Sequence, residues 1–165
     1  MSRVWMIFGT GAHARKACQC AVLGGDTVAA FVDENPAARA PVPDVPVLPA
    51  AVLTSSAPGD LFVAIGNAAA RCRLMDQCAA QGWRLPALVH PKACVAPDAV
   101  LGEGVLVAAG AVIESGAHIG RGSIVDIGVL VDHDCLVAAF THLRPGQVCP
   151  AGSAWPVLSP RPPPA

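Results

Sequence analysis

Apolar positions recur every six residues in the second half of the chain. A mostly small residue stands two places before each repeated aliphatic residue, and glycine stands three places after most of them. An α-helix cannot keep one face apolar at a period of six, whereas short strands joined by glycine corners can. The aliphatic positions are Val95, Leu101, Val107, Ile113, Ile119, Val125, Val131, Val137 and Leu143, and the glycines are Gly104, Gly110, Gly116, Gly122, Gly128 and Gly146. The pattern predicts stacked short strands with a corner every six residues.

The first 90 residues follow a different pattern, in which apolar runs alternate with helical periodicity. Strands are expected over residues 3–8, 27–32 and 61–65, with helices over 12–23 and from Gly66-Asn67 to about residue 80. The proline-rich stretch 37–49 is expected to be an extended excursion on the surface. A last strand leads to His90-Pro91. Alternating strands and helices predict an α/β fold with a parallel sheet.

The change of period predicts two domains and a tail. Residues 1–90 would form a Rossmann-like α/β domain, and residues 91–148 a domain of stacked short strands. Residues 149–165 are expected to be an irregular proline-rich tail, since prolines remove the backbone donors that a strand needs.

Composition and charge exclude several classes of partner. The chain has 165 residues, 53% of them hydrophobic and 14% charged, with a formal net charge of −1. This balance predicts no binding to nucleic acid or to an anionic membrane. The longest apolar runs fall short of the ~18 residues that span a bilayer, and the N-terminal run is too short for a signal peptide. We therefore expect a cytoplasmic protein whose seven cysteines are reduced.

The best candidate for catalysis is the segment Asp132-His133-Asp134-Cys135. Asp134 stands at the corner position that glycine fills in the five preceding repeats, and Asp tolerates the left-handed backbone expected there. Two neighbouring carboxylates stabilise the imidazolium form of His133 and make the ring more basic, as a general base requires. The alternative is a solvated corner histidine with local hydrogen bonds. Cys135 lies at the small-residue position, where packing accounts for it.

Three motifs in the first 90 residues follow strand ends. Gly9-Thr10-Gly11 lies between a strand and a helix, where backbone amides can hold a diphosphate, although Ala14 breaks the full GxGxxG pattern. A plain structural turn is an equal alternative. His13 would donate to phosphate or lie on the surface, and Asp33-Glu34 would recognise the nucleoside or cap a loop. Gly66-Asn67 follows a third strand, so the three motifs are expected to meet at one sheet edge.

The ordered set of motifs resembles the PglD/NeuD-type sugar acetyltransferases of bacterial glycan biosynthesis, over nearly the whole chain up to Gly146. That family implies a nucleotide-sugar-binding role for residues 1–90, and a left-handed β-helix acyltransferase domain of about three coils over residues 91–148. The motifs are Gly9-Thr10-Gly11-Ala12-His13, Asp33-Glu34, Ile65-Gly66-Asn67, His90-Pro91, Val131-Asp132-His133-Asp134-Cys135 and His142-Leu143-Arg144-Pro145-Gly146.

The resemblance implies transfer of an acetyl group from acetyl-CoA to an amine of a nucleotide-linked sugar of the UDP-4-amino-sugar type, in a homotrimer and without a metal. O-acetylation of a sialic-acid-type sugar is the close variant. His133 would be the base, Asp134 the acid that tunes it, and His142 the acetyl-CoA contact. The residues expected to bind the nucleotide-sugar are Gly11, Ala12, His13, Asp33, Glu34, Gly66 and Asp126, the last where the family usually carries Asn.

Two other functional classes stay open. A metal-dependent β-helix enzyme of the γ-carbonic-anhydrase kind would use His118, His133 and His142, but their spacings of fifteen and nine residues lack that family's short His–x4–His pair. Related chains continue through further coils, so the proline-rich ending is interpreted as a truncation or a shifted reading frame. A shortened chain would bind a nucleotide-sugar or trimerise without turnover.

Overall fold

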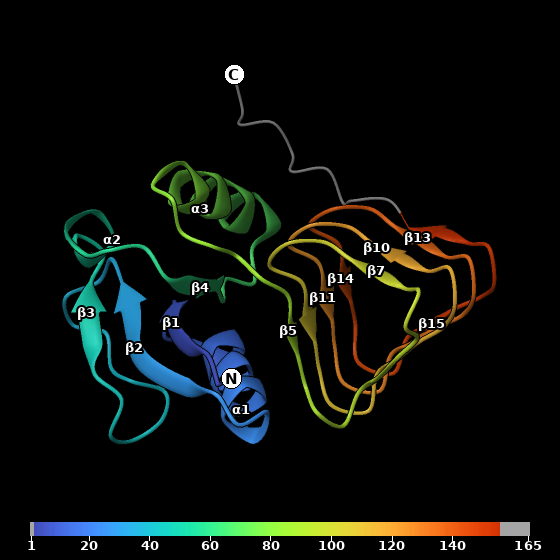
Figure 1. Cartoon of the computed structure of the whole chain (residues 1–165), viewed down its shortest axis with the longest axis horizontal. Helices are drawn as coiled ribbons and strands as arrows, with labels where there is room; N and C mark the ends of the chain where they lie inside the picture. The colour runs from blue at the N-terminus through green and yellow to red at the C-terminus, as the bar shows by residue number, and fades with distance from the viewer. Residues whose placement is uncertain (1, 156–165) are drawn as a thin grey trace.

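The computed structural model describes residues 2–155, and its N-terminal part is a parallel four-stranded sheet (Figure 1). The strands run in the order β3-β2-β1-β4, with β1 in the centre flanked by β2 and β4. Every neighbouring pair is parallel, as the alternation of strands and helices predicts. The elements are β1 (Val4–Phe8), α1 (Ala12–Leu23), β2 (Thr27–Asp33), β3 (Val47–Pro49), α2 (Val52–Ser55), β4 (Asp60–Val63) and α3 (Ala68–Ala80).

The stretch 37–49 is not only a surface excursion, because its last three residues form β3. This strand pairs with β2 through Phe31↔Val47 and Val32↔Leu48. Prolines before and inside it are tolerated since β3 lies at the edge of the sheet. The expected strand before His90 also exists, as β5 (Leu88–Val89), but it joins the second part of the molecule.

The second part is a prism of two-residue strands stacked in coils (Figure 1). Three parallel sheets form its faces, in the orders β16-β13-β10-β7, β14-β11-β8-β5 and β15-β12-β9-β6. The repeated aliphatic is the second residue of each strand between residues 94 and 143, Cys149 and Trp155 take that place in the last two strands, and these side chains form the core of the prism. The strands after β5 are β6 (Cys94–Val95), β7 (Val100–Leu101), β8 (Leu106–Val107), β9 (Val112–Ile113), β10 (His118–Ile119), β11 (Ile124–Val125), β12 (Leu130–Val131), β13 (Leu136–Val137), β14 (His142–Leu143), β15 (Val148–Cys149) and β16 (Ala154–Trp155).

Most corners of the prism have left-handed backbone. Glycines at these positions have φ between 62° and 72°, a region that L-residues with a Cβ rarely adopt. Asp134 (φ 58°) and Phe140 (φ 60°) occupy the same corner position without being glycine. Residues other than glycine are uncommon in this conformation, so Asp134 and Phe140 are candidates for a functional role.

One face of the prism packs on the N-terminal part. The outward residues Leu106 and Ile124 of the β14-β11-β8-β5 sheet are buried in one cluster with residues of α1. Leu130 and Leu136, the equivalent residues of the other two sheets, are exposed. The outward aliphatic residues therefore pack on the N-terminal part on one face of the prism and are exposed on the other two faces.

The prism extends beyond the predicted limits of 91–148, since β5 precedes them and β16 follows them. The remainder of the predicted tail, residues 156–165, lies outside the described residues. Among residues 2–155, no helix is long and apolar enough to cross a bilayer.

Candidate functional site

The carboxyl ends of β1, β2 and β4 carry the three motifs expected at one sheet edge. Because β1 has β2 on one side and β4 on the other, the loops that follow β1 and β4 flank the position at which α/β sheets generally bind ligands. Gly9 has φ 107°, and a Cβ there would press on Ile65 and on the carbonyl oxygen of Ala64. Gly11 begins α1 with extended backbone and no side-chain cap, which leaves the first helical N–H groups free for an anion.

The two acidic residues after β2 have different surroundings. Asp33 accepts hydrogen bonds from Thr10 Oγ1 at 2.7 Å and from the N–H of Asn35 at 2.9 Å. Its carboxylate therefore joins the glycine loop to the end of β2. Glu34 is exposed, so its carboxylate is the more accessible of the two to a ligand.

His13 lies where α1 approaches both the β4–α3 loop and the prism. A Cβ on Gly66 would be 3.1 Å from the His13 ring, so the glycine makes room for the imidazole. The ring meets that of His142 edge to face, with 5.4 Å between centroids. Burial is the larger cause that lowers the pKa of His13, and electrostatic repulsion from His142 is the second. The His13 ring is therefore neutral at pH 7. Its buried Nδ1 has no partner within residues 2–155.

Asp126 is buried at the corner after β11, and its carboxylate joins α1 to the prism. Lys16 Nζ lies 2.5 Å from Oδ1, and His142 Nε2 lies 3.1 Å from Oδ2. The N–H of Ile127 also donates to Oδ1 at 2.8 Å. Burial raises the pKa of Asp126, but these three donors outweigh it and hold the pKa below its ordinary value. The carboxylate is therefore ionised at neutral pH, and both of its oxygens already accept hydrogen bonds.

His133 stands on another edge of the prism, between β12 and β13. Its ring Nδ1 lies 2.8 Å from Asp134 Oδ2, and its backbone N–H donates to Asp132 Oδ1 at 2.8 Å. The hydrogen bond to Asp134, followed by the charge of Asp132, raises the pKa of His133. An ionised carboxylate only accepts hydrogen bonds, so the neutral ring carries its hydrogen on Nδ1 and keeps a lone pair on Nε2. The His133 side chain is 60% exposed, which leaves Nε2 open to a substrate.

One chain does not bring His133 and His142 together. The His133 edge lies between the β15-β12-β9-β6 and β16-β13-β10-β7 faces, whereas the N-terminal part covers the third face. In a triangular prism the edge between two faces is opposite the third. The predicted residues thus form one group around His13, Gly66, Asp126 and His142, and a second group at His133 and Asp134.

A cavity of about 530 Å³ lies beside the first group, between the start of α3 and the last coils of the prism. It is lined by Gly66, Ala68, Arg71, Phe140, Thr141, His142, Leu143, Arg144, Gln147 and Trp155. Arg71 is buried and donates to four backbone carbonyl oxygens, those of Gly122, Ile65, Gly66 and Phe140. The guanidinium therefore fixes the β4–α3 loop to the wall of the cavity.

Sequence reasoning missed Lys16, Arg71 and Phe140. The signal for Phe140 was present, since it stands at a corner position otherwise filled by glycine, as Asp134 does. Lys16 and Arg71 gave none, because a basic residue on a helix ordinarily lies in solvent and only tertiary packing buries it.

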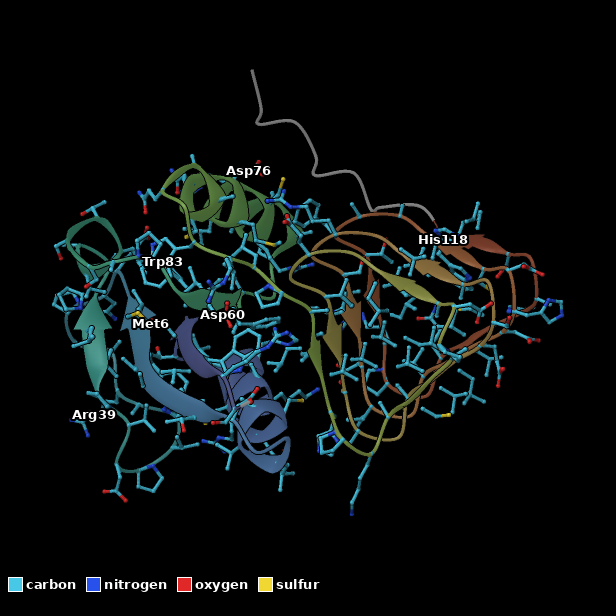
Figure 2. The ribbon with its side chains drawn as sticks, in the orientation of Figure 1. Met6, Arg39, Asp60, Asp76, Trp83 and His118 are labelled. Atoms are coloured by element: carbon cyan, nitrogen blue, oxygen red, sulfur yellow. The ribbon has the colours of Figure 1, made fainter. Side chains whose placement is uncertain are left out.

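The three histidines of the metal alternative lie apart. His118 is on β10 and exposed (Figure 2). His142 begins β14 on the face toward α1, and His133 is at the corner between β12 and β13. Within residues 2–155, no three or more His, Cys, Asp and Glu side chains are grouped closely enough to hold a metal ion.

Comparisons with known proteins identify the family of the chain. The PglD N-terminal domain family matches residues 5–78. A perosamine N-acetyltransferase from Caulobacter crescentus, solved as a histidine-to-asparagine variant with CoA and GDP-perosamine, is 35% identical, with a TM-score of 0.85 over 91% of this chain and 72% of that one. The chain belongs to the family of PglD-type sugar acetyltransferases.

Other solved structures agree with this assignment. The acetyltransferase domain of PglB from Neisseria gonorrhoeae FA1090, in complex with acetyl coenzyme A, is 35% identical, with a TM-score of 0.81 over 90% of this chain and 73% of that one. WeeI from Acinetobacter baumannii AYE is 18% identical with a TM-score of 0.72, a likeness of fold alone. A comparison with curated protein sequences finds no match. The predicted family, the fold class of an α/β domain followed by a left-handed β-helix, and the acetyltransferase class of enzyme are confirmed.

Proposed function

We propose that the chain transfers the acetyl group of acetyl-CoA to an amino group of a nucleotide-linked sugar, with His133 as general base. The observation that carries the proposal is the His133–Asp134 pair, with its accessible Nε2 lone pair on an edge of the prism. The matched relatives support the substrates, since one was solved with CoA and GDP-perosamine and another with acetyl coenzyme A. A cytoplasmic location belongs to the same proposal.

The proposed chemistry is direct transfer. The neutral amine of the sugar attacks the thioester carbonyl carbon, forming the C–N bond and a tetrahedral intermediate. His133 Nε2 takes a proton from the nitrogen as positive charge develops there, and Asp134 stabilises the resulting imidazolium. The C–S bond then breaks, and the CoA thiolate leaves and receives a proton from His133. Each step balances without an acyl-enzyme.

The separation of the two groups of residues supports a site shared between copies of the chain. The nucleotide-sugar would bind at Gly11, Ala12, His13, Glu34 and Gly66 of one copy, and the base would come from the His133 edge of the next. Asp33 and Asp126 belong to the same predicted set, Asp33 through its hold on the glycine loop and Asp126 through its hold on His142.

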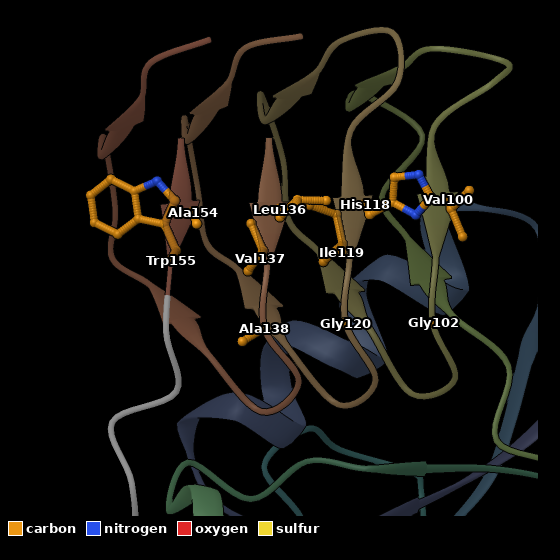
Figure 3. A pocket seen from close by; sticks show the side chains of 10 residues that line it. All are labelled: Val100, Gly102, His118, Ile119, Gly120, Leu136, Val137, Ala138, Ala154 and Trp155. Atoms are coloured by element: carbon orange, nitrogen blue, oxygen red, sulfur yellow. The ribbon is translucent and has the colours of Figure 1, made fainter. Parts of the chain in front are cut away.

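Both prism faces that meet at His133 support this arrangement, because their outer surfaces are apolar. Val100 is 49% exposed and Leu136 56% on one face, where they lie in a row with His118 and line a shallow hollow (Figure 3). Leu130 and Val148 are exposed on the other. Two different apolar patches that pack head to tail close into a ring, so we assign the homotrimer to these faces.

The substrate class is tested with purified full-length chain, acetyl-CoA and either GDP-perosamine or a UDP-linked amino sugar. The expected result is release of CoA thiol together with a sugar product heavier by one acetyl group. The matched control is the corresponding sugar with a hydroxyl in place of the amine, which should be acetylated poorly. Binding of the sugar without thiol release would instead favour the non-catalytic alternative, and acetylation of the hydroxyl sugar the O-acetyl variant.

The assembly is tested by Leu136→Glu, which places a charge in the proposed contact. We expect the mass in light scattering to fall from trimer to monomer and turnover to be lost with it. Val22→Glu, at an equally exposed position of α1, is the matched control and should stay trimeric. A wild-type monomer with full activity would refute the shared site.

A further inference from the structure

Asp126 makes a network between α1 and β14, and none of the proposed proton transfers passes through it. One buried carboxylate accepts from Lys16, His142 and the N–H of Ile127. Only 3% of the Asp126 side chain is exposed, and about a third of that of Lys16, so the ion pair is largely shielded from solvent. Shielded, charge-assisted hydrogen bonds fix geometry more firmly than exposed ones.

The network determines which nitrogen of His142 carries the hydrogen. An ionised carboxylate can only accept a hydrogen bond, so His142 Nε2 must be the N–H donor. In the neutral imidazole the other nitrogen, Nδ1, then has the lone pair. Lys16 keeps Asp126 ionised, and His13, the other ring at this contact, is neutral and brings no competing charge. His142 forms no other side-chain hydrogen bond within residues 2–155, and it lines the 530 Å³ cavity.

We propose that Lys16 and Asp126 are positioning residues that hold His142 as the Nε2–H tautomer, so that Nδ1 accepts a hydrogen bond from an N–H group of the acyl donor. Acetyl-CoA carries two amide N–H groups in the arm that ends in the thioester, and these are the groups an acceptor can hold. A donor role for neutral His142 toward the thioester carbonyl oxygen is excluded by the same tautomer. The identity of the ligand rests on the proposed function, whereas the tautomer of His142 follows from the contacts of Asp126 alone.

Nitrogen-15 NMR of full-length chain labelled at histidine tests the tautomer directly. The His142 signals are identified as those missing from His142→Gln. The expected wild-type spectrum shows protonated Nε2 and unprotonated Nδ1 for His142. Protonation of Nδ1 in the neutral ring would overturn the proposal, and this test requires no variant of Asp126 or Lys16 to fold.

Kinetics of variants separate positioning from simple structural support. Asp126→Ala should give a mixture of His142 tautomers and raise the KM for acetyl-CoA about three- to tenfold, the loss of one hydrogen bond. Lys16→Met should act in the same direction, and Lys16→Arg should restore both readouts. Arg84→Met removes the cation of the 2.7 Å Arg84–Asp60 pair and is the matched control with unchanged KM.

The outcomes distinguish this proposal from the proposed function. An unchanged tautomer in folded Asp126→Ala overturns the positioning role, whatever the activity. The expected tautomer in a wild-type chain that transfers no acetyl group supports the positioning role and refutes the enzymatic function.

Discussion

Gly116 offers a sharp test of how the His133–Asp134 pair is held. Gly116 lies one coil from Asp134, and the N–H of Asp134 donates to the carbonyl oxygen of Ser115. The Asp134 carboxylate occupies the space beside Gly116. A Cβ added to Gly116 would clash with Asp134 Oδ1, because the two atoms would be closer than their van der Waals radii allow. Gly116→Ala must therefore push the carboxylate away from His133 Nδ1.

The size of the effect separates into two parts. Gly116 has φ 72°, and alanine in left-handed backbone costs roughly 1–2 kcal/mol. This cost corresponds to a fall in Tm of about 2–4 °C for each kcal/mol in a chain of this length. The second part is the loss of the partner that orients the base, for which we expect kcat/KM to fall roughly 10- to 100-fold, within the usual contribution of general acid–base catalysis.

Gly110→Ala is the matched control. Gly110 has φ 70°, but the atom nearest to an added Cβ, the backbone nitrogen of Gly128, is 4.0 Å away. Both variants should lose the same stability in calorimetry, whereas only Gly116→Ala should lose activity in a CoA-release assay. Equal activity in the two variants would refute the claim that Asp134 positions His133.

Three further outcomes follow from the same contacts. The kcat/KM for the sugar should rise with pH as His133 loses its proton, with an inflection above the ordinary 6.5, and Asp134→Asn should move that inflection to lower pH in a pH–rate profile. Arg71→Met should lower the free energy of unfolding in urea by about 3 kcal/mol, because four buried or partly buried carbonyl oxygens lose their donor, whereas exposed Arg73→Met should change it little. Because folding lowers the pKa of Asp126, its ionised carboxylate stabilises the folded chain fully at pH values above the ordinary pKa of 3.8, and this stabilisation is lost as the pH falls through the pKa of the folded state. Asp126→Ala should therefore make the free energy of unfolding less dependent on pH in acid.

The prism was predictable because its signal is local and repeated. Each six-residue repeat places an aliphatic residue inside the prism, and most repeats place glycine at a corner with positive φ. The position of His133 relative to His142 also follows from the repeat. Strands eighteen residues apart pair, as His118 does with Leu136, so two residues nine apart lie half a coil from each other.

The contacts between the two parts were not predictable in the same way. Lys16 and Arg71 lie on helices whose sequence does not mark them as contacts to the prism, and they meet partners 110 and 51 residues away. The strand β3 was missed because prolines obscure a short edge strand whose pairing depends on β2. Tertiary packing decides such features, and periodicity carries no information about it.

Acetyl transfer through His133 is tested most directly by a single turnover with radiolabelled acetyl-CoA and GDP-perosamine, in the wild-type chain and in His133→Ala. The account predicts that label moves to the sugar in the wild type and stays on CoA in the variant, although calorimetry shows that the variant still binds the nucleotide-sugar. Transfer at the wild-type rate in His133→Ala would contradict it.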